Sequence, residues 1–184
     1  MRLTTAEGIM NWESLTFKAG FLFAGVLVVA TTGCGTVQHN LMLQNDYVPK
    51  AGSKIGVGLV SNETGTTFDI PIETMFKDAL VSALQEQGMP GPGAPLDLVT
   101  NCRIVSYQKG DAFKRWLMPG VGSTELDVRC VLLDSGKSVG DIAAKRTVDA
   151  GGAYTIGAWE KIFAHVASDV AEDIGEKFAV RKIQ

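Results

Sequence analysis

Two segments of this sequence alternate between apolar and polar side chains, and this pattern constrains the fold more than any other feature. The first covers residues 96–107 and the second residues 124–132. A period of two places apolar side chains on one face of a β-strand and polar ones on the other. We therefore expect two strands with one buried face, which carries Leu98, Cys102, Ile104, Leu126, Val128, Cys130 and Leu132.

A tight turn follows the second of these strands. The stretch DSGKS, residues 134–138, contains Gly136, which can adopt the positive φ that hairpin turns require. A three-residue loop here would place Cys130 opposite Ile142, so that apolar side chains meet on one face. A third strand is therefore predicted at about residues 138–148.

Two other segments carry apolar residues at helical spacing. The first has Asp69 as its expected cap, Pro71 in its first turn and Gly88 as its C-terminal stop. The second covers residues 159–178. Each segment has one continuous apolar stripe, which is typical of a helix that packs on a sheet. A short apolar run at residues 53–60 precedes the first helix and is typical of a buried strand.

The predicted order of elements is β-α-β-β-β-α, which indicates an α/β protein of the α+β two-layer type. We expect a four-stranded sheet with both helices on one face. If the first strand is parallel to its neighbour, the crossover between them through the first helix is right-handed. Residues 53–184 are long enough for one domain with its own core. The net charge of −3 does not favour nucleic acid as a partner.

The N-terminal segment has the arrangement of an export signal. Lys18 precedes the apolar residues 21–30, and small residues lead to Cys34. The apolar stretch is shorter than the roughly 20 residues that a helix needs to cross a bilayer. Residues 1–33 are therefore predicted to be a signal peptide, and Met10 is an alternative start.

The sequence TTGC at residues 31–34 resembles the lipobox of bacterial lipoproteins, although Thr31 stands where leucine is usual. The resemblance implies that Cys34 becomes the acylated N-terminus and that residues 34–52 form a tether, in which His39 would be solvated. Gly35, in place of aspartate, implies the outer membrane, facing the periplasm. An uncleaved inner-membrane signal anchor is the alternative.

Cys102 and Cys130 lie on the apolar faces of two adjacent predicted strands. A symmetric hairpin would place them directly opposite, and an exported protein meets an oxidising compartment, so a disulfide is one interpretation. The same register sets Arg103 against Arg129, which is unfavourable. A shift of two residues would pair Arg103 with Asp127 and leave two reduced core cysteines.

The segment between these two strands mixes basic and large apolar residues, a composition that occurs at binding surfaces and at membrane surfaces. We interpret it as a partner-binding loop; the alternative is that its apolar side chains cover one end of the sheet. The predicted contact residues are Phe113, Lys114, Arg115, Trp116, Leu117 and Met118.

The sequence contains no motif of a hydrolase nucleophile or a phosphate-binding loop. His165 is expected to be exposed or half-buried. The cluster Asp169, Glu172, Asp173 and Glu176 is interpreted as a solvated helix face and not as a metal site. We therefore predict a protein that is not an enzyme and needs no metal or cofactor.

The segment from Trp116 to Val148, with the closing helix, resembles an uncharacterised family of bacterial lipoproteins through Pro119, Gly120, Gly122, Asp134 and Gly136. The order of elements is similar to the periplasmic domains of curli-secretion lipoproteins and of lipoprotein activators of penicillin-binding proteins. The resemblance implies an envelope scaffold or regulator that binds another envelope protein or itself. A ligand-binding protein or enzyme with a pocket between helices and sheet is the alternative.

Overall fold

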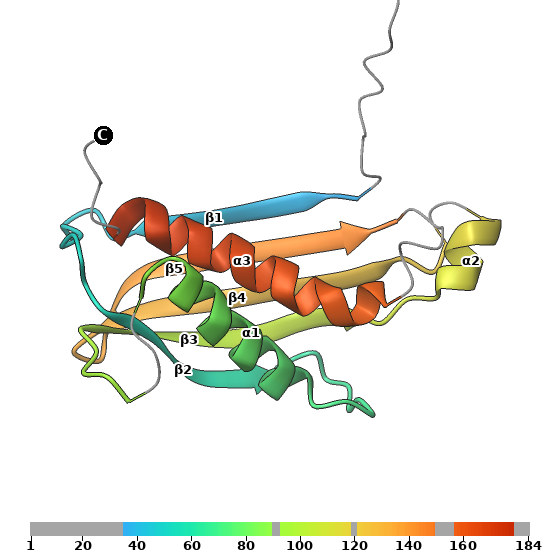
Figure 1. The fold of residues 1–184 in the computed structure, drawn as a ribbon, viewed down its shortest axis with the longest axis horizontal. Coiled ribbons are helices and arrows are strands. Elements are labelled where there is room, and N and C mark those ends of the chain that lie inside the picture. Colours follow the sequence, from blue (N-terminus) through green and yellow to red (C-terminus); the bar gives the residue numbers. More distant parts are fainter. Residues whose placement is uncertain (1–34, 90–92, 119–120, 150–156, 179–184) are drawn as a thin grey trace, which may run out of the picture. The chain divides into compact units, whose positions relative to one another are not determined.

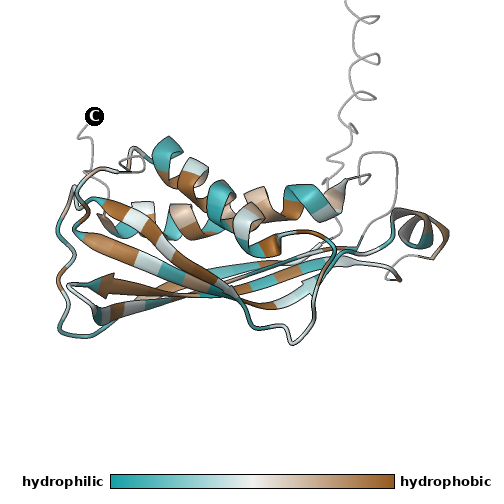
Figure 2. Ribbon diagram, turned by 90° about the horizontal axis from the view of Figure 1, so that it is seen from below, coloured by the Kyte–Doolittle hydropathy of each residue, from teal (hydrophilic) through white to brown (hydrophobic). Residues whose placement is uncertain are grey.

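The computed structural model describes residues 35–89, 93–118, 121–149 and 157–178, with the backbone alone at 112, 115 and 116. In the described residues, helices α1 and α3 pack on one face of a five-stranded sheet (Figures 1 and 2). The elements are β1 (Val37–Leu43), β2 (Ile55–Asn62), α1 (Ile72–Glu86), β3 (Leu98–Gln108), α2 (Ala112–Leu117), β4 (Thr124–Asp134), β5 (Lys137–Val148) and α3 (Ala158–Phe178).

The α+β class is as expected, but the prediction of a four-stranded sheet is wrong. The strand order is β1-β5-β4-β3-β2, and β1 pairs antiparallel with β5, with Leu41 opposite Ile142. Residues 37–43, expected to lie in a tether, are therefore an edge strand. β2 and β3 are parallel and are connected through α1, and the other neighbours are antiparallel.

The core lies between the helices and the sheet. The apolar stripes of both helices are buried there, with Phe76 of α1 and Phe163 and Phe178 of α3 almost completely enclosed. Asp69 does not cap α1, because the helix begins after Pro71 without a side-chain cap. Gly88 follows the helix with φ of 80°, as expected of a residue that ends a helix.

The β4–β5 hairpin reaches the predicted register by a different route. Cys130 lies opposite Ile142, as expected. The turn contains two residues with positive φ, Ser135 at 49° and Gly136 at 82°, and a β-bulge near Leu133 supplies the remaining offset.

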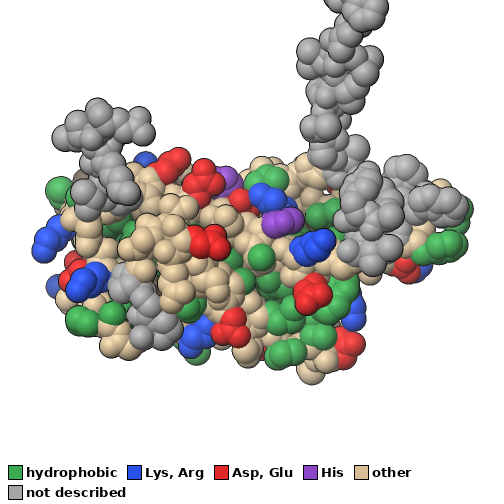
Figure 3. Space-filling model, in the orientation of Figure 1, with side chains coloured by type: hydrophobic (Ala, Val, Ile, Leu, Met, Phe, Trp, Pro, Cys, Tyr) green, Lys and Arg blue, Asp and Glu red, His purple; other side chains and the backbone are tan. Residues whose placement is uncertain are grey.

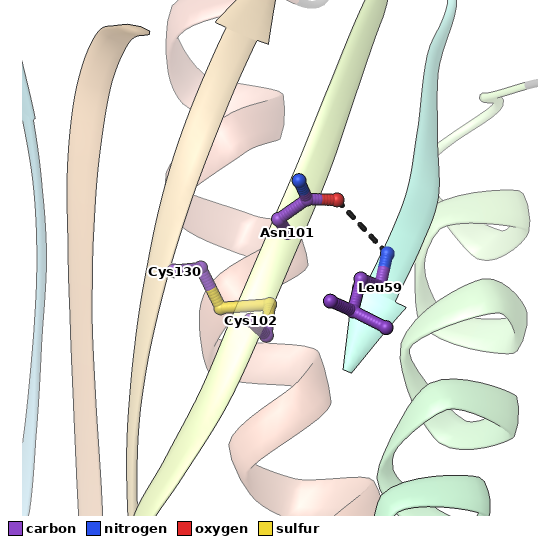
Figure 4. The surroundings of a disulfide bond; sticks show 4 residues. All are labelled: Leu59, Asn101, Cys102 and Cys130. Atoms are coloured by element: carbon purple, nitrogen blue, oxygen red, sulfur yellow. Dashed lines mark hydrogen bonds between the residues drawn. A yellow bond between two sulfur atoms is a disulfide. The ribbon is translucent and has the colours of Figure 1, made fainter. Parts of the chain in front are cut away.

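An irregularity in the edge strand β2 is filled by a side chain from β3. The register between β2 and β3 shifts between Val57 and Val60. The Asn101 side-chain oxygen accepts a hydrogen bond of 2.9 Å from the Leu59 backbone N–H (Figure 4). Gly58 is required here, because a Cβ atom at this residue would clash with the Asn101 side chain.

Candidate functional site

The sheet face opposite the helices is uncovered in the described structure (Figure 2). The polar side chains of β3 and β4 that were predicted to face water lie here, together with polar side chains of β5, and most of them are charged. We call this surface the uncovered face; it includes Asn101, Arg103, Glu125, Asp127, Arg129, Asp141 and Lys145.

Two arginines face each other at the centre of the uncovered face. Arg103 of β3 lies directly opposite Arg129 of β4, and their side chains are 52 % and 49 % exposed. Like charges at directly opposed positions destabilise a sheet. The nearest carboxylate to Arg103 is that of Glu63, at 3.9 Å, a distance too long for a hydrogen bond. This arginine pair therefore has capacity for a further anionic group.

The carboxylates of β4 compensate the arginine pair only in part. Asp127 Oδ1 lies 3.2 Å from Arg129 Nε, but the two groups are not aligned for a hydrogen bond, and this buried oxygen has no hydrogen-bond partner among the described residues. Glu125 instead pairs with Lys145 at 3.1 Å. The charge of Arg103 is therefore the least compensated of the basic charges on this face.

A small residue beside the arginine pair leaves two hollows. Ala143 lies opposite Arg129 on β5, and the two residues line both hollows, of about 210 and 150 Å³. Met42 closes the first hollow and Asn40 the second, and both belong to β1. The uncovered face thus has shallow hollows next to exposed guanidinium groups, and this combination is common where proteins bind one another.

The two strand cysteines form the cross-strand pair next to the arginine pair, and their side chains lie on the covered face of the sheet. Cys102 and Cys130 are directly opposite, with Cα atoms 4.0 Å apart, and the structure joins them by a disulfide (Figure 4). Both cysteines are buried. The register is thus the symmetric one, which also brings Arg103 and Arg129 together.

The acidic cluster of α3 is not a solvated face throughout, so this prediction is wrong in part. Asp169 and Asp173 are buried, whereas Glu172 and Glu176 are exposed. Two of the Arg146 nitrogens donate to Asp169, at 2.8 and 3.2 Å.

His39 is not solvated in a tether, because it lies on β1 and binds α3. Its Nδ1 lies 2.9 Å from Asp173 Oδ1. This hydrogen bond, with the negative charges of Asp173, Asp169 and Glu172, raises the pKa of His39. His165 lies on the exposed side of α3, and burial of its ring, with the charge of Arg146, lowers its pKa.

The predicted partner-binding loop contains the short helix α2, which projects at one end of the sheet (Figure 1). Phe113, Lys114, Leu117 and Met118 are exposed. The side chains of Arg115 and Trp116 lie outside the described residues. Leu117 is exposed, so it does not cover the sheet end, whereas for Trp116 that alternative stays untested.

A further hollow of about 430 Å³ lies in the connection between β2 and α1. Its lining includes Asn62, Phe68, Asp69 and Glu73. This is a loop region and not the space between helices and sheet, where a pocket was the alternative expectation. Within the described ranges, no group of three or more His, Cys, Asp or Glu side chains is placed to hold a metal ion.

Several predicted residues lie outside the described part of the chain. These are the signal peptide at residues 1–33, the lipidation site Cys34, and Pro119 and Gly120 of the turn. The acylation of Cys34 therefore stays a prediction from the sequence. No helix of the described residues is both long and apolar enough to cross a membrane.

Comparison with known proteins supports the class of fold. Residues 71–152 match a family described as a domain of unknown function, DUF4410. The sequence matches none of the curated proteins with which it was compared. The likeness to curli-secretion lipoproteins stays a prediction.

The chain is similar to solved structures of low sequence identity. A PelC dodecamer from Paraburkholderia phytofirmans has a TM-score of 0.52 and 14 % identity, over 80 % of this chain and 99 % of that chain. A candidate lipoprotein from Caulobacter crescentus CB15 has a TM-score of 0.38 and 17 % identity, over 66 % and 85 % of the two chains. At these identities the comparisons establish a shared fold with the first protein and nothing further.

Proposed function

We propose that this protein is a lipid-anchored envelope protein that works without catalysis, as a binding module for an acidic segment of another envelope protein. Cys34 carries the anchor, and the uncovered face carries the binding site. The predicted export signal and the TTGC sequence support the anchor. We place the protein at the outer membrane, facing the periplasm.

The arginine pair is the observation that carries the binding role. Fold stability alone would favour an opposite-charge pair at these positions, since two cations side by side repel. Arg103 and Arg129 together present two planar donor groups that fit a carboxylate, and the hollows beside Ala143 fit a small apolar side chain next to it. A carboxylate supplied by a partner would relieve this repulsion when it binds.

The fold relative with the higher TM-score is described as a dodecamer. Self-association through the uncovered face is therefore the second form of this proposal, with the acidic group supplied by another copy. Asp141 is exposed on β5 and is one such group.

Site-specific photo-crosslinking in intact cells tests the binding site. A photoreactive amino acid at Asn40, beside one hollow, should crosslink to a protein partner, whereas the same group at the exposed Lys77 of α1 should not. The crosslink should disappear in the double variant Arg103→Glu, Arg129→Glu and be weakened but still detectable with Arg103→Lys, Arg129→Lys, which keeps the charges and loses the planar donors. Mass spectrometry of the adduct identifies a different protein or a second copy.

Crosslinks from Lys77 in place of Asn40 would overturn this assignment. Crosslinks from Asn40 that persist in the variant Arg103→Glu, Arg129→Glu would overturn it as well. The hollow between β2 and α1 supports an alternative, a receptor for a small cationic ligand, because it carries Asp69 and Glu73. In that case Asp69→Asn, Glu73→Gln should abolish the function while the arginine variants retain it.

A further inference from the structure

We propose that the end of the domain formed by α2 and the start of β1 is a membrane-contacting surface. It would lie in the headgroup region of the leaflet that holds the acyl chains. This inference rests on the proposed acylation of Cys34 and adds a second, non-covalent contact with lipid. We call this region the α2 end; its described residues are Val37, Phe113, Lys114, Leu117, Met118 and Val121.

The α2 end exposes large apolar side chains close together. Phe113 is 67 % exposed, Leu117 63 % and Met118 55 %, and Val121 is also exposed. Figure 3 shows hydrophobic side chains at this end of the molecule. An exposed apolar cluster on a folded domain marks a surface that contacts something other than water.

Hydrogen bonds of Asp111 hold this cluster in a fixed position. The side-chain Oδ1 of Asp111 accepts hydrogen bonds from the backbone N–H groups of Phe113 and Lys114 and thereby caps α2. The Asp111 backbone N–H donates to the Gly122 carbonyl at 2.8 Å, which closes the loop. The exposed apolar side chains therefore lie on a hydrogen-bonded helix and loop.

The α2 end also contains the point where the chain leaves towards Cys34. The Thr147 backbone N–H donates to the Thr36 carbonyl at 2.9 Å. Thr147 lies opposite Glu125, which lies opposite Gln108, the last residue of β3 before α2. A single row of paired residues across the sheet therefore connects the start of β1 with the residue that precedes the α2 segment.

The chain between Cys34 and the α2 end is short, because β1 belongs to the sheet and begins at Val37. Only residues 35 and 36 separate Cys34 from the first residue of β1, Val37. Three residue steps span at most about 10 Å, and the headgroup region is roughly 5–8 Å deep on each side of the hydrocarbon. An acylated Cys34 therefore holds the α2 end against the membrane surface.

The chemistry of the α2 end suits this position. Lys114 is exposed among the apolar side chains, and the sequence adds Arg115 and Trp116 to the same helix. Basic residues are attracted to anionic headgroups, and aromatic residues favour the interfacial region. The β4–β5 hairpin at the opposite end of the sheet instead carries Asp134, Ser135 and Lys137, although Val48 and Leu96 are exposed near it.

Fluorescence quenching by lipids tests this surface. The acylated protein is purified from membranes as Leu117→Cys or Lys137→Cys, labelled with nitrobenzoxadiazole, and placed in vesicles of phosphatidylethanolamine and phosphatidylglycerol. Cys34 is acylated and the other two native cysteines are bonded to each other, so only the new thiol reacts. The lipids carry nitroxide groups near the top of their acyl chains.

We expect the label at Leu117 to shift to the blue and to lose emission to the nitroxide lipids. The label at Lys137, about 35 Å away along β4, should do neither and should be quenched by iodide in the water. The exposed Phe113→Cys is a second position that should follow Leu117. Circular dichroism and unfolding midpoints check that each labelled variant is folded.

The failures of the two proposals are distinguishable. Intact mass without acyl groups, or protein that does not float with the vesicles, contradicts the proposed anchor. Acylated protein that floats with the vesicles but leaves the Leu117 label open to iodide overturns the membrane-contacting surface alone. That outcome would assign the α2 end to a protein partner, because these vesicles contain lipid only.

Discussion

The two faces of the sheet both carry side chains of β3, β4 and β5, but one face is covered by the helices and the other is not. The covered face of β4 presents Leu126, Val128 and Leu132, all fully buried under the helices. The uncovered face of the same strand presents Asp127 and Arg129, with about half of the arginine side chain exposed. The first face therefore determines stability, whereas the second contributes little to it and carries the binding site that we propose.

The strongest test of this difference is a cavity in the covered face. Phe76 of α1 is completely buried, so Phe76→Ala should lower the free energy of unfolding by about 3–5 kcal/mol. Urea unfolding measures the loss. As a matched control, Met42→Ala on the uncovered face should change stability by less than about 0.5 kcal/mol. Equal effects would mean that the uncovered face is packed in solution.

The disulfide should give the next largest effect. It closes a loop with a sequence separation of 28 residues, and such a bond stabilises a fold by about 2–4 kcal/mol. Unfolding with and without a reductant should differ by this amount. The difference should vanish in the variant Cys102→Ala, Cys130→Ala; if the wild-type protein gives no difference, the two thiols are not bonded in solution.

A smaller effect is expected at the polar rim of the covered face, where β1 meets α3. The pKa of His39 is raised by Asp173, so the charged histidine stabilises the fold at pH below its unfolded value near 6.5. This contribution is lost as pH rises through the higher folded-state pKa. His39→Gln should cost on the order of 0.5–1 kcal/mol at pH 5 and nearly nothing at pH 9.

The measurement is the difference in unfolding midpoint between the wild-type protein and His39→Gln at each pH. The difference cancels the opposite contribution of His165, whose pKa is lowered. A difference that grows with increasing pH would contradict the assigned pair of His39 and Asp173.

The smallest effect on stability is expected at the arginine pair. Arg103→Gln removes the repulsion with Arg129 and only a weak contact with Glu63, so unfolding should change by less than about 0.5 kcal/mol. Partner crosslinking from Asn40 should nevertheless fall. A large loss of stability with unchanged crosslinking would show that the pair is structural.

The sequence predicted the central strands and both long helices because their patterns are strong. Apolar side chains repeat every second residue in β3 and β4, and α3 has a nearly continuous stripe that ends at Phe178. The opposed arginines were also visible in the sequence, as the unfavourable consequence of the symmetric register. They were not recognised there as a candidate site, although the repulsion was the signal.

The missed elements depend on contacts that no local pattern contains. In β1 the burial is confined largely to Leu41, so the edge strand lacks the alternation of a central strand. The buried Asp173 was interpreted as solvated because its partner His39 lies 134 residues away in the sequence. Arg146, the partner of Asp169, lies on another element and gives no sequence signal either.

The irregularity in β2 has a consequence for aggregation through the edge of the sheet. A foreign chain that joined this edge would need evenly spaced peptide groups, and the offset between Val57 and Val60 interrupts that spacing. Leu59 is exposed at the same place, and an exposed apolar edge strand without such an interruption would be prone to aggregation. The Asn101 side chain, bound to the Leu59 backbone, thus helps to keep this edge from pairing with the strand of another molecule.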